Sequence, residues 1–490
     1  MAKTGLDKDL KRIGRAQSAT RETAMRFGPV GLAALFLAAV WLVTSLQADG
    51  IHGNFLIIAA VIGGYMALNI GANDVANNVG PAVGSKALTL TGALIIAAIF
   101  EAAGAILAGG DVVSTISKGI IDPMAMPSTE HFIRAMISAL LAAGIWLHMA
   151  TYIGAPVSTT HSIVGGVLGA GIASVDVNVV NWMTMGKIAA SWVISPVLGG
   201  LIAALFLAFI KSRIIYQEDK IAAAKKWVPV LVAIMVTAFT VYMMVKGLKR
   251  LWEPEAELIV ICALVAFAVS YFILRPVIAR AAFGLENRRA SVAELFTYPL
   301  IFAACLLSFA HGANDVANAV GPLAAIVTAV TTGGIAAKAE VPFWVMGVGA
   351  IGISLGLALF GPKLIRTVGA EITKLDRARA FCVALSAAIT VIAASALGLP
   401  VSSTHIAVGA IFGVGFLREF RSNRTNNNLQ SNTSLEPLSK KKQRKARKRK
   451  LVRRQHLITI VSAWLITVPA AAALAMAFCL GLDYFMQHSG

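Results

Sequence analysis

The chain has 490 residues, of which 57% are hydrophobic and only 14% are charged. This composition, with many apolar runs of about 20 residues, excludes a soluble globular protein and predicts an all-α polytopic membrane protein. Most of the net charge of +19 lies in two polar segments, 1–26 and 418–455, so the basic balance does not describe the membrane body. The four cysteines lie singly in apolar runs, which predicts small buried side chains without a metal site.

Eleven apolar runs predict membrane-spanning helices, and the first is expected to be a retained helix because no cleavage site follows it. The runs lie at 29–46, 54–70, 88–108, 131–151, 187–210, 228–245, 257–275, 294–310, 343–361, 378–397 and 456–480. Two shorter apolar segments, 156–173 and 400–417, each open with a proline and a hydroxyl cluster.

The distribution of lysine and arginine predicts the orientation. The N-terminus and the basic connections 211–226, 275–291, 362–379 and 418–455 are expected inside, whereas 47–53, 109–130 and 174–186 are expected outside. This count leaves the C-terminus outside. Lys246, Lys249 and Arg250 break the rule.

A polar motif occurs twice in the apolar sequence. Gly71-Ala72-Asn73-Asp74-Val75-Ala76-Asn77 returns as Gly312-Ala313-Asn314-Asp315-Val316-Ala317-Asn318. The predicted topology makes the preceding helices enter the membrane from opposite sides, so the halves are inverted repeats, which is typical of a secondary transporter with a site near the midplane. A second motif pair, Pro156 to His161 and Pro400 to His405, has nearly the same spacing and supports one duplication.

These repeats divide the chain into five parts. Residues 1–53 form a basic cytoplasmic N-terminus with an extra helix, 54–210 the first inverted repeat, 211–291 a linker with two membrane helices, 292–480 the second repeat with its basic loop 418–455, and 481–490 a tail. The run 440–454 in that loop indicates attraction to anionic lipid, with nucleic-acid binding or regulation as the alternatives.

The hydroxyl clusters predict anion-binding helix ends inside the membrane. Proline suits the first turn of a helix and serine or threonine its cap, and the free N–H groups there attract anions. Hydroxyls that bond back to their own helix are the alternative. The candidate donors are Ser158, Thr159, Thr160, Ser402, Ser403 and Thr404.

The Asn-Asp motifs predict cation sites. Gly71, Gly80 and Pro81, with their second-half equivalents, are expected to break the helices, and the exposed carbonyls would join carboxylate and amide oxygens around a small hard cation. Asp74 and Asp315 are the anionic ligands, and Asn73, Asn77, Asn314 and Asn318 the neutral ones. Because two buried aspartates repel an oxyanion, anion binding should depend on cation binding. Protonated phosphate can donate to an aspartate and sulfate cannot, which favours phosphate.

Three further residues keep open roles. Glu101 is an intramembrane acid without an acidic equivalent in the second half, and it could line the path, bind a coupling proton or cation, or pair with a neighbouring helix. His161 and His405 end the two hydroxyl clusters and could be structural donors or proton carriers.

At these motifs the chain resembles the inorganic phosphate transporter (PiT) family. The resemblance covers about residues 54 to 480 and implies an inverted-repeat fold with broken helices and two re-entrant hairpin-like segments, often in a homodimer. It places phosphate at the six hydroxyl residues with Asn73 and Asn314, and cations at Asp74, Asp315, Asn77 and Asn318. The Gly-Ala-Asn-Asp form, continued by Val83 to Lys86 and by Phe100-Glu101, is similar to the sodium-coupled branch.

The sequence therefore predicts a sodium-coupled symporter of inorganic phosphate that works by alternating access and is not an enzyme. Its coupling ion is sodium, it needs no cofactor, and its partners are phosphate, sodium, lipids and a second copy, but not nucleic acid. Its expected location is the plasma (inner) membrane. The alternatives are proton-coupled phosphate or metal-phosphate transport, sulfate transport, an intramembrane hydrolase and a passive anion channel.

Overall fold

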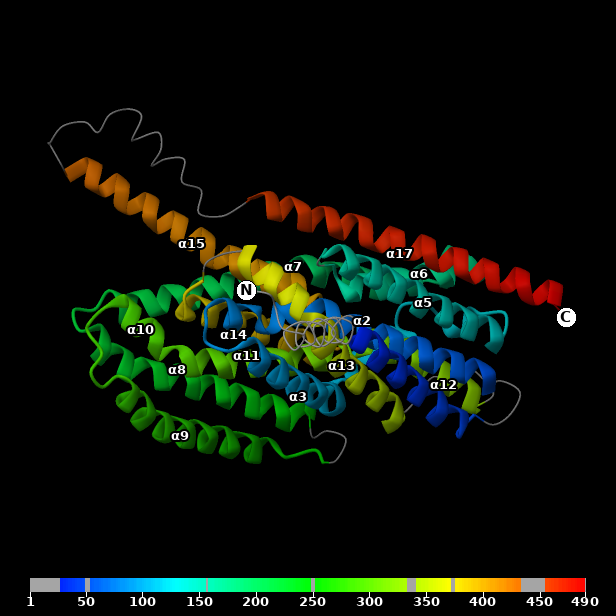
Figure 1. The fold of residues 1–490 in the computed structure, drawn as a ribbon, viewed down its shortest axis with the longest axis horizontal. Helices are drawn as coiled ribbons and strands as arrows, with labels where there is room; N and C mark the ends of the chain where they lie inside the picture. The colour runs from blue at the N-terminus through cyan, green and yellow to red at the C-terminus, as the bar shows by residue number, and fades with distance from the viewer. Residues whose placement is uncertain are drawn as a thin grey trace, which may run out of the picture.

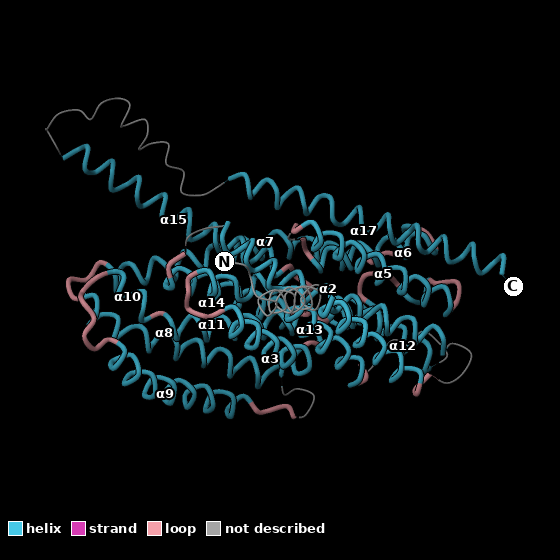
Figure 2. The backbone as a smooth tube through the Cα atoms, viewed as in Figure 1, coloured by secondary structure: helices cyan, strands magenta, loops and turns pink. Residues whose placement is uncertain are grey.

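The computed structural model describes residues 27–48, 53–155, 157–247, 252–332, 341–371, 375–432 and 454–489. Within these ranges the regular elements are helices (Figure 2), and the β-structure is one isolated bridge between Ile121 and Val180. Among the described residues, eleven helices are long and apolar enough to cross a membrane, as predicted. The chain is thus an all-helical multi-pass membrane protein. The N-terminal segment 1–26, Pro156 and the basic run 440–453 lie outside the described residues.

The first half contains an N-terminal helix, Phe27–Ser45, followed by six labelled helices. These are α2 (Gly53–Gly84), α3 (Leu90–Ala108), α4 (Gly110–Lys118), α5 (Thr129–Ile153), α6 (Thr159–Ser174) and α7 (Trp182–Ile210). Short 3₁₀ turns lie at Pro123–Ala125 and Val177–Val179, and a π-helical turn, Lys211–Ile215, extends α7.

The remaining chain contains α8 (Lys220–Tyr242), a π-helical turn (Met243–Gly247), α9 (Ala256–Ala281), α10 (Arg289–Leu295), α11 (Thr297–Asp315), α12 (Ala317–Thr332), α13 (Phe343–Glu371), α14 (Arg377–Ala396), α15 (Ser403–Asn432) and α17 (Arg454–Ser489). Figure 1 shows most of these helices running along the long axis of the view, with α10 at the left and the C-terminus at the right. The helices α4 and α12 are additions to the predicted spans.

Close helix packing shows how the two halves correspond. A Cβ on Gly71 would lie 2.0 Å from the carbonyl oxygen of Ile353, and one on Gly312 would lie 2.1 Å from that of Glu101. Gly71 and Gly312 hold the same place in the duplicated motif, so α2 packs on α13 as α11 packs on α3. Ile353 is therefore the counterpart of Glu101.

The predicted breaks at the motif glycines are wrong in the first copy and displaced in the second. α2 stays helical from Gly53 through Pro81 to Gly84, and the second copy divides at Val316, between α11 and α12. The reason is tertiary packing, since Gly71 and Gly312 allow helix backbones to approach. Gly321 instead leaves room for the Ile116 side chain, which would lie 2.8 Å from an added Cβ.

Two ion pairs join segments that were predicted to lie on the outer side. The Arg134 Nε lies 2.7 Å from Asp483 Oδ1, which brings the start of α5 to the end of α17. Lys246 Nζ lies 2.5 Å from Asp111 Oδ2. Lys246 was an exception to the charge rule, and its pairing with an aspartate reduces the positive charge that the rule counts.

Candidate functional site

Two hairpins bring the hydroxyl clusters into the protein interior. Each consists of a helix, a turn at a glycine with positive φ (Gly154 at 77° and Gly398 at 67°) and a new helix that begins at Thr159 or Ser403. Ser158 Oγ accepts a hydrogen bond of 3.1 Å from the His161 backbone N–H, and Ser402 Oγ accepts one of 3.3 Å from that of His405. The predicted serine caps and buried helix starts are therefore present.

The asparagines that precede the aspartates hold the hairpins in place. Asn73 donates from Nδ2 to Thr151 Oγ1 at 2.9 Å, and Asn314 donates to Ser395 Oγ at 2.9 Å. Asn314 Oδ1 also accepts from the Val401 N–H at 3.2 Å. The two asparagines expected to bind phosphate thus contact the last turns of α5 and α14, which lead into the hydroxyl clusters.

Each Asn-Asp motif forms hydrogen bonds with the hairpin of the other repeat. Asp74 of the first repeat accepts a 2.9 Å hydrogen bond from the hydroxyl of Thr404, which belongs to the second hairpin. Asn77 donates to the same hydroxyl at 2.8 Å and to Asp74 Oδ1 at 3.3 Å.

The reciprocal contact uses Asn318 of the second repeat. Its amide donates to Thr159 Oγ1 at 3.3 Å and to Thr160 Oγ1 at 3.2 Å, both in the first hairpin. Thr160 in turn donates to the Val401 carbonyl at 2.9 Å. Each Asn-Asp motif therefore contacts the hydroxyl cluster of the other repeat, and the predicted residues of both halves meet in one buried region.

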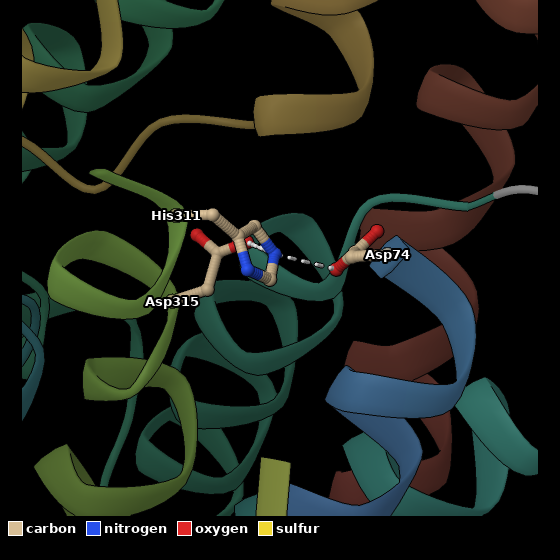
Figure 3. Close-up of side chains that lie close together, drawn as sticks. All are labelled: Asp74, His311 and Asp315. Atoms are coloured by element: carbon tan, nitrogen blue, oxygen red, sulfur yellow. Dashed lines mark ion pairs between the residues drawn. The ribbon is translucent and has the colours of Figure 1, made fainter. Parts of the chain in front are cut away.

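A buried histidine lies between the two aspartates (Figure 3). His311 Nε2 is 2.8 Å from Asp315 Oδ2 and 3.7 Å from Asp74 Oδ2. One ligand atom from each of the three side chains lies within 4.8 Å of the others, which is compatible with holding a cation. Asp315 Oδ2 also accepts from Ser403 Oγ at 3.2 Å.

Glu101 completes this cluster from α3. Its Oε2 lies 3.3 Å from His311 Nδ1, and its Oε1 accepts a 2.7 Å hydrogen bond from Asn78 Nδ2. All three side chains are buried. Of the roles left open for Glu101, the contact with a neighbouring helix is present.

Sequence reasoning missed His311 and Asn78, although a signal existed. Both stand where the repeats differ, because the counterpart of His311 is Ile70 and that of Asn78 is Ala319. Glu101 differs in the same way from Ile353. The three residues that differ between the repeats lie together, because Asn78 contacts Glu101 and Glu101 contacts His311.

The carboxylate cluster, defined as Asp74, Glu101, His311 and Asp315, also offers acceptor atoms without donors. Within the described residues, Asp315 Oδ1 and Asn318 Oδ1 are buried without a hydrogen-bond partner. Buried polar atoms without a partner need an explanation. Oxygen atoms of carboxylates and amides are suitable ligands for a hard cation.

His161 and His405 contact each other. Their ring centroids are 4.7 Å apart in an edge-to-face arrangement, and His161 also packs on Trp192 with centroids 3.8 Å apart. The Trp192 Nε1–H donates to the Pro400 carbonyl at 3.2 Å. The two histidines thus form a contact between the hairpins, and a role in coupling stays a prediction.

Comparison with known proteins agrees with this architecture. The sequence model of a family described as the phosphate transporter family matches residues 70–475. A Helicobacter pylori (strain J99) protein named "Putative phosphate permease" is 46% identical over 98% of this chain and 100% of its own length. A Chlamydia trachomatis protein of the same name is 38% identical over 87% of this chain and 98% of its own.

A solved structure titled "The sodium-dependent phosphate transporter" superposes with a TM-score of 0.78 and 37% identity, over 88% of this chain and 99% of that chain. The family match spans most of the sequence, both repeats and all the motifs of the site. The chain therefore belongs to the phosphate transporter family.

Proposed function

We propose that the chain is a symporter that moves inorganic phosphate together with sodium by alternating access. The observation that carries this proposal is the set of hydrogen bonds between the repeats. Thr404 bonds to Asp74, and Asn318 bonds to Thr159 and Thr160. One ligand region shared by two inverted repeats suits a site that opens alternately to either side.

The charges of the carboxylate cluster support cation coupling. Three carboxylates surround one imidazole, so the cluster has a negative excess whenever the three carboxylates are ionised. An oxyanion entering this buried region would be repelled strongly unless mobile cations entered with it. Sodium therefore has an electrostatic reason to bind before phosphate.

We assign sodium to Asp74, Asn77, Asp315 and Asn318, and phosphate to the hydroxyl residues of the hairpins, Ser158, Thr159, Thr160, Ser402, Ser403 and Thr404. Four of those hydroxyls lie within hydrogen-bond distance of an aspartate or asparagine of the motifs. For Asn73 and Asn314 we favour positioning of the hairpins over direct contact with phosphate, because their amide N–H groups bond to the turns.

Proton coupling is a second candidate, and His311 is the observation that favours it. A histidine placed between carboxylates can carry a proton. In this case the proton on His311 would replace one coupling sodium. Homodimerisation, an inner-membrane location and a cytoplasmic N-terminus remain predictions.

Uptake of radiolabelled phosphate into proteoliposomes tests the proposal. An inward sodium gradient should drive accumulation, and Asp74→Asn or Asp315→Asn should lower it at least about tenfold, because each removes a proposed cation ligand. Asp122→Asn is the matched control, since Asp122 is an exposed loop residue that caps a 3₁₀ turn. Accumulation that is driven equally well by a proton gradient without sodium would overturn sodium coupling.

A further inference from the structure

A polar pocket of about 340 Å³ is lined in part by residues of α10. α10 lies at the left of Figure 1. The pocket shares no lining residue with the carboxylate cluster. We call it the basic pocket, because the charged residues that line it are Lys211, Arg289, Arg379, Arg418 and Asp376. Its volume is at the lower end of the range for small-molecule sites.

The four cations of the basic pocket come from segments far apart in the sequence. Lys211 follows the last residue of α7, Arg289 is the first residue of α10, and Arg379 lies in the first turn of α14. Arg418 is in α15. These residues belong to the four connections that the charge pattern predicts on the inner side, so the fold gathers those connections around one pocket.

The basic pocket has a strong positive excess. Asp376, the one acidic residue among the described residues that line it, is already engaged by Arg379, with Oδ1 accepting from its backbone N–H at 2.9 Å and Oδ2 lying 2.7 Å from its guanidinium. The charges of Arg289, Arg379 and Arg418 act repulsively on Lys211. Holding these like charges together costs free energy, which a bound anion would offset.

A neighbouring arginine extends the same charge. Arg421 lies over the ring of Tyr216, with its guanidinium carbon 5.7 Å from the ring centroid, and Tyr216 lines the pocket. The positive charge of Arg421 also acts on Lys211. Several arginines around one small cavity suit a phosphate group, whose oxygens arginine binds through paired N–H donors.

We propose that the basic pocket is a second anion site, outside the transport path, that binds a phosphate group. The group can belong to the headgroup of an anionic lipid or to soluble inorganic phosphate, because the recognising chemistry is the same.

The position of the basic pocket would let a bound anion link α7 to the second hairpin. α14 and α15 are the two arms of the second hairpin, and α15 begins with Ser403 and Thr404 at the site. α15 packs backbone to backbone on α7, since a Cβ on Gly413 would lie 1.9 Å from the Gly200 carbonyl. An anion bound by Lys211 and Arg418 therefore ties the base of this hairpin to α7 and, if the proposed function holds, limits hairpin movement during transport.

Thermal unfolding of the full-length protein in lipid nanodiscs tests the site. Sodium-free buffer removes the cation-dependent site from the measurement. One arm titrates inorganic phosphate in phosphatidylcholine nanodiscs, and the other replaces part of the phosphatidylcholine by phosphatidylglycerol. The pocket variant is Lys211→Gln with Arg418→Gln, and the matched control is Arg213→Gln with Lys225→Gln, which removes two exposed cations from the same end of the protein.

The unfolding midpoint of the parent and of the control should rise with one of the two anions, and the arm in which it rises identifies the source. The pocket variant should need roughly tenfold more anion for the same rise, because two charge-assisted contacts are lost. Without anion its midpoint should equal or exceed that of the parent, since repulsion is relieved. Arg289→Gln, at an exposed lining position, should weaken the response in the same direction.

An equal response of parent and pocket variant to both anions would overturn the proposal. This result is independent of the transport proposal, because binding at the basic pocket needs neither sodium nor Asp74. Failure of sodium-driven uptake with an intact pocket response would reject the transport assignment alone.

Discussion

Three buried polar residues at the site have apolar counterparts in the other repeat, and the three lie together. Asn78, Glu101 and His311 bond in series, whereas their counterparts Ala319, Ile353 and Ile70 are apolar. The interface of α2 with α13 thus contains the apolar residues Ile70 and Ile353, where the interface of α11 with α3 contains the ionisable residues His311 and Glu101. Buried ionisable groups in a membrane protein are costly, which is why we propose a role in transport for this departure from the repeat.

The asymmetry leads to a prediction about His311. Changing His311→Ile should destabilise the protein by about 3–5 kcal/mol, because Glu101 and Asp315 lose their buried partner. Adding Glu101→Ile and Asn78→Ala installs the residues of the other repeat and should restore most of the stability without restoring transport. Unfolding in nanodiscs and phosphate uptake measure the two effects. Equal stability of the single and triple variants would contradict the proposed network.

Sequence reasoning reached the residues that the duplication repeats. Asp74 and Asp315 stand out because a costly aspartate occurs twice in the same register. His311 has no such copy. In the sequence, the only indication of its place in the cluster is that it precedes Asp315 by four residues, which puts both side chains on one face of a helix. Contacts between repeats, such as Thr404 with Asp74, depend on how the hairpins pack and are not expressed in any local pattern.

At the scale of elements, glycine determines how closely the helices approach. Glycine lowers helix propensity, which is why breaks were predicted at Gly71 and Gly80. α2 remains helical at both residues because packing against neighbouring helices outweighs local preference. Gly71 is needed for close contact with α13, whereas an added Cβ on Gly80 would meet no atom of a neighbouring helix within 4 Å.

Because Gly71 lies in close contact with α13 and Gly80 does not, substitutions at these two positions of one helix form a matched pair. Gly71→Ala should destabilise the protein by about 1–3 kcal/mol or more, because the new Cβ collides with the Ile353 carbonyl. Gly80→Ala should leave stability unchanged or raise it by up to about 1 kcal/mol through helix propensity. Thermal unfolding of both variants in nanodiscs is the measurement. Similar losses at both positions would show that helix packing is not the cause.

At the scale of the whole molecule, apolar length and charge predicted most of the fold. All eleven predicted spans are present, and the connections expected inside do converge on the basic pocket. The helices α4 and α12 were not predicted, because α4 is too short for a span and α12 follows directly on the second motif. Their positions depend on contacts with distant helices, which hydropathy does not report.

The predicted orientation can be tested by labelling single cysteines in a background with the four native cysteines replaced by alanine. Met124→Cys, at a position 76% exposed in the connection expected outside, should react with a membrane-impermeant maleimide in intact cells. Glu218→Cys, exposed in a connection expected inside, should react only after permeabilisation. The reverse pattern would place the basic pocket on the outer side.

Counting bound phosphate tests the shared site most directly. Equilibrium binding of radiolabelled phosphate, with the sodium-free amount subtracted, should give one sodium-dependent phosphate per chain. Asp74→Asn and Asp315→Asn should each abolish all of it, because both repeats build the same site. If either variant instead retained half of the sodium-dependent binding at the parent affinity, the repeats would hold separate sites and the account would be contradicted.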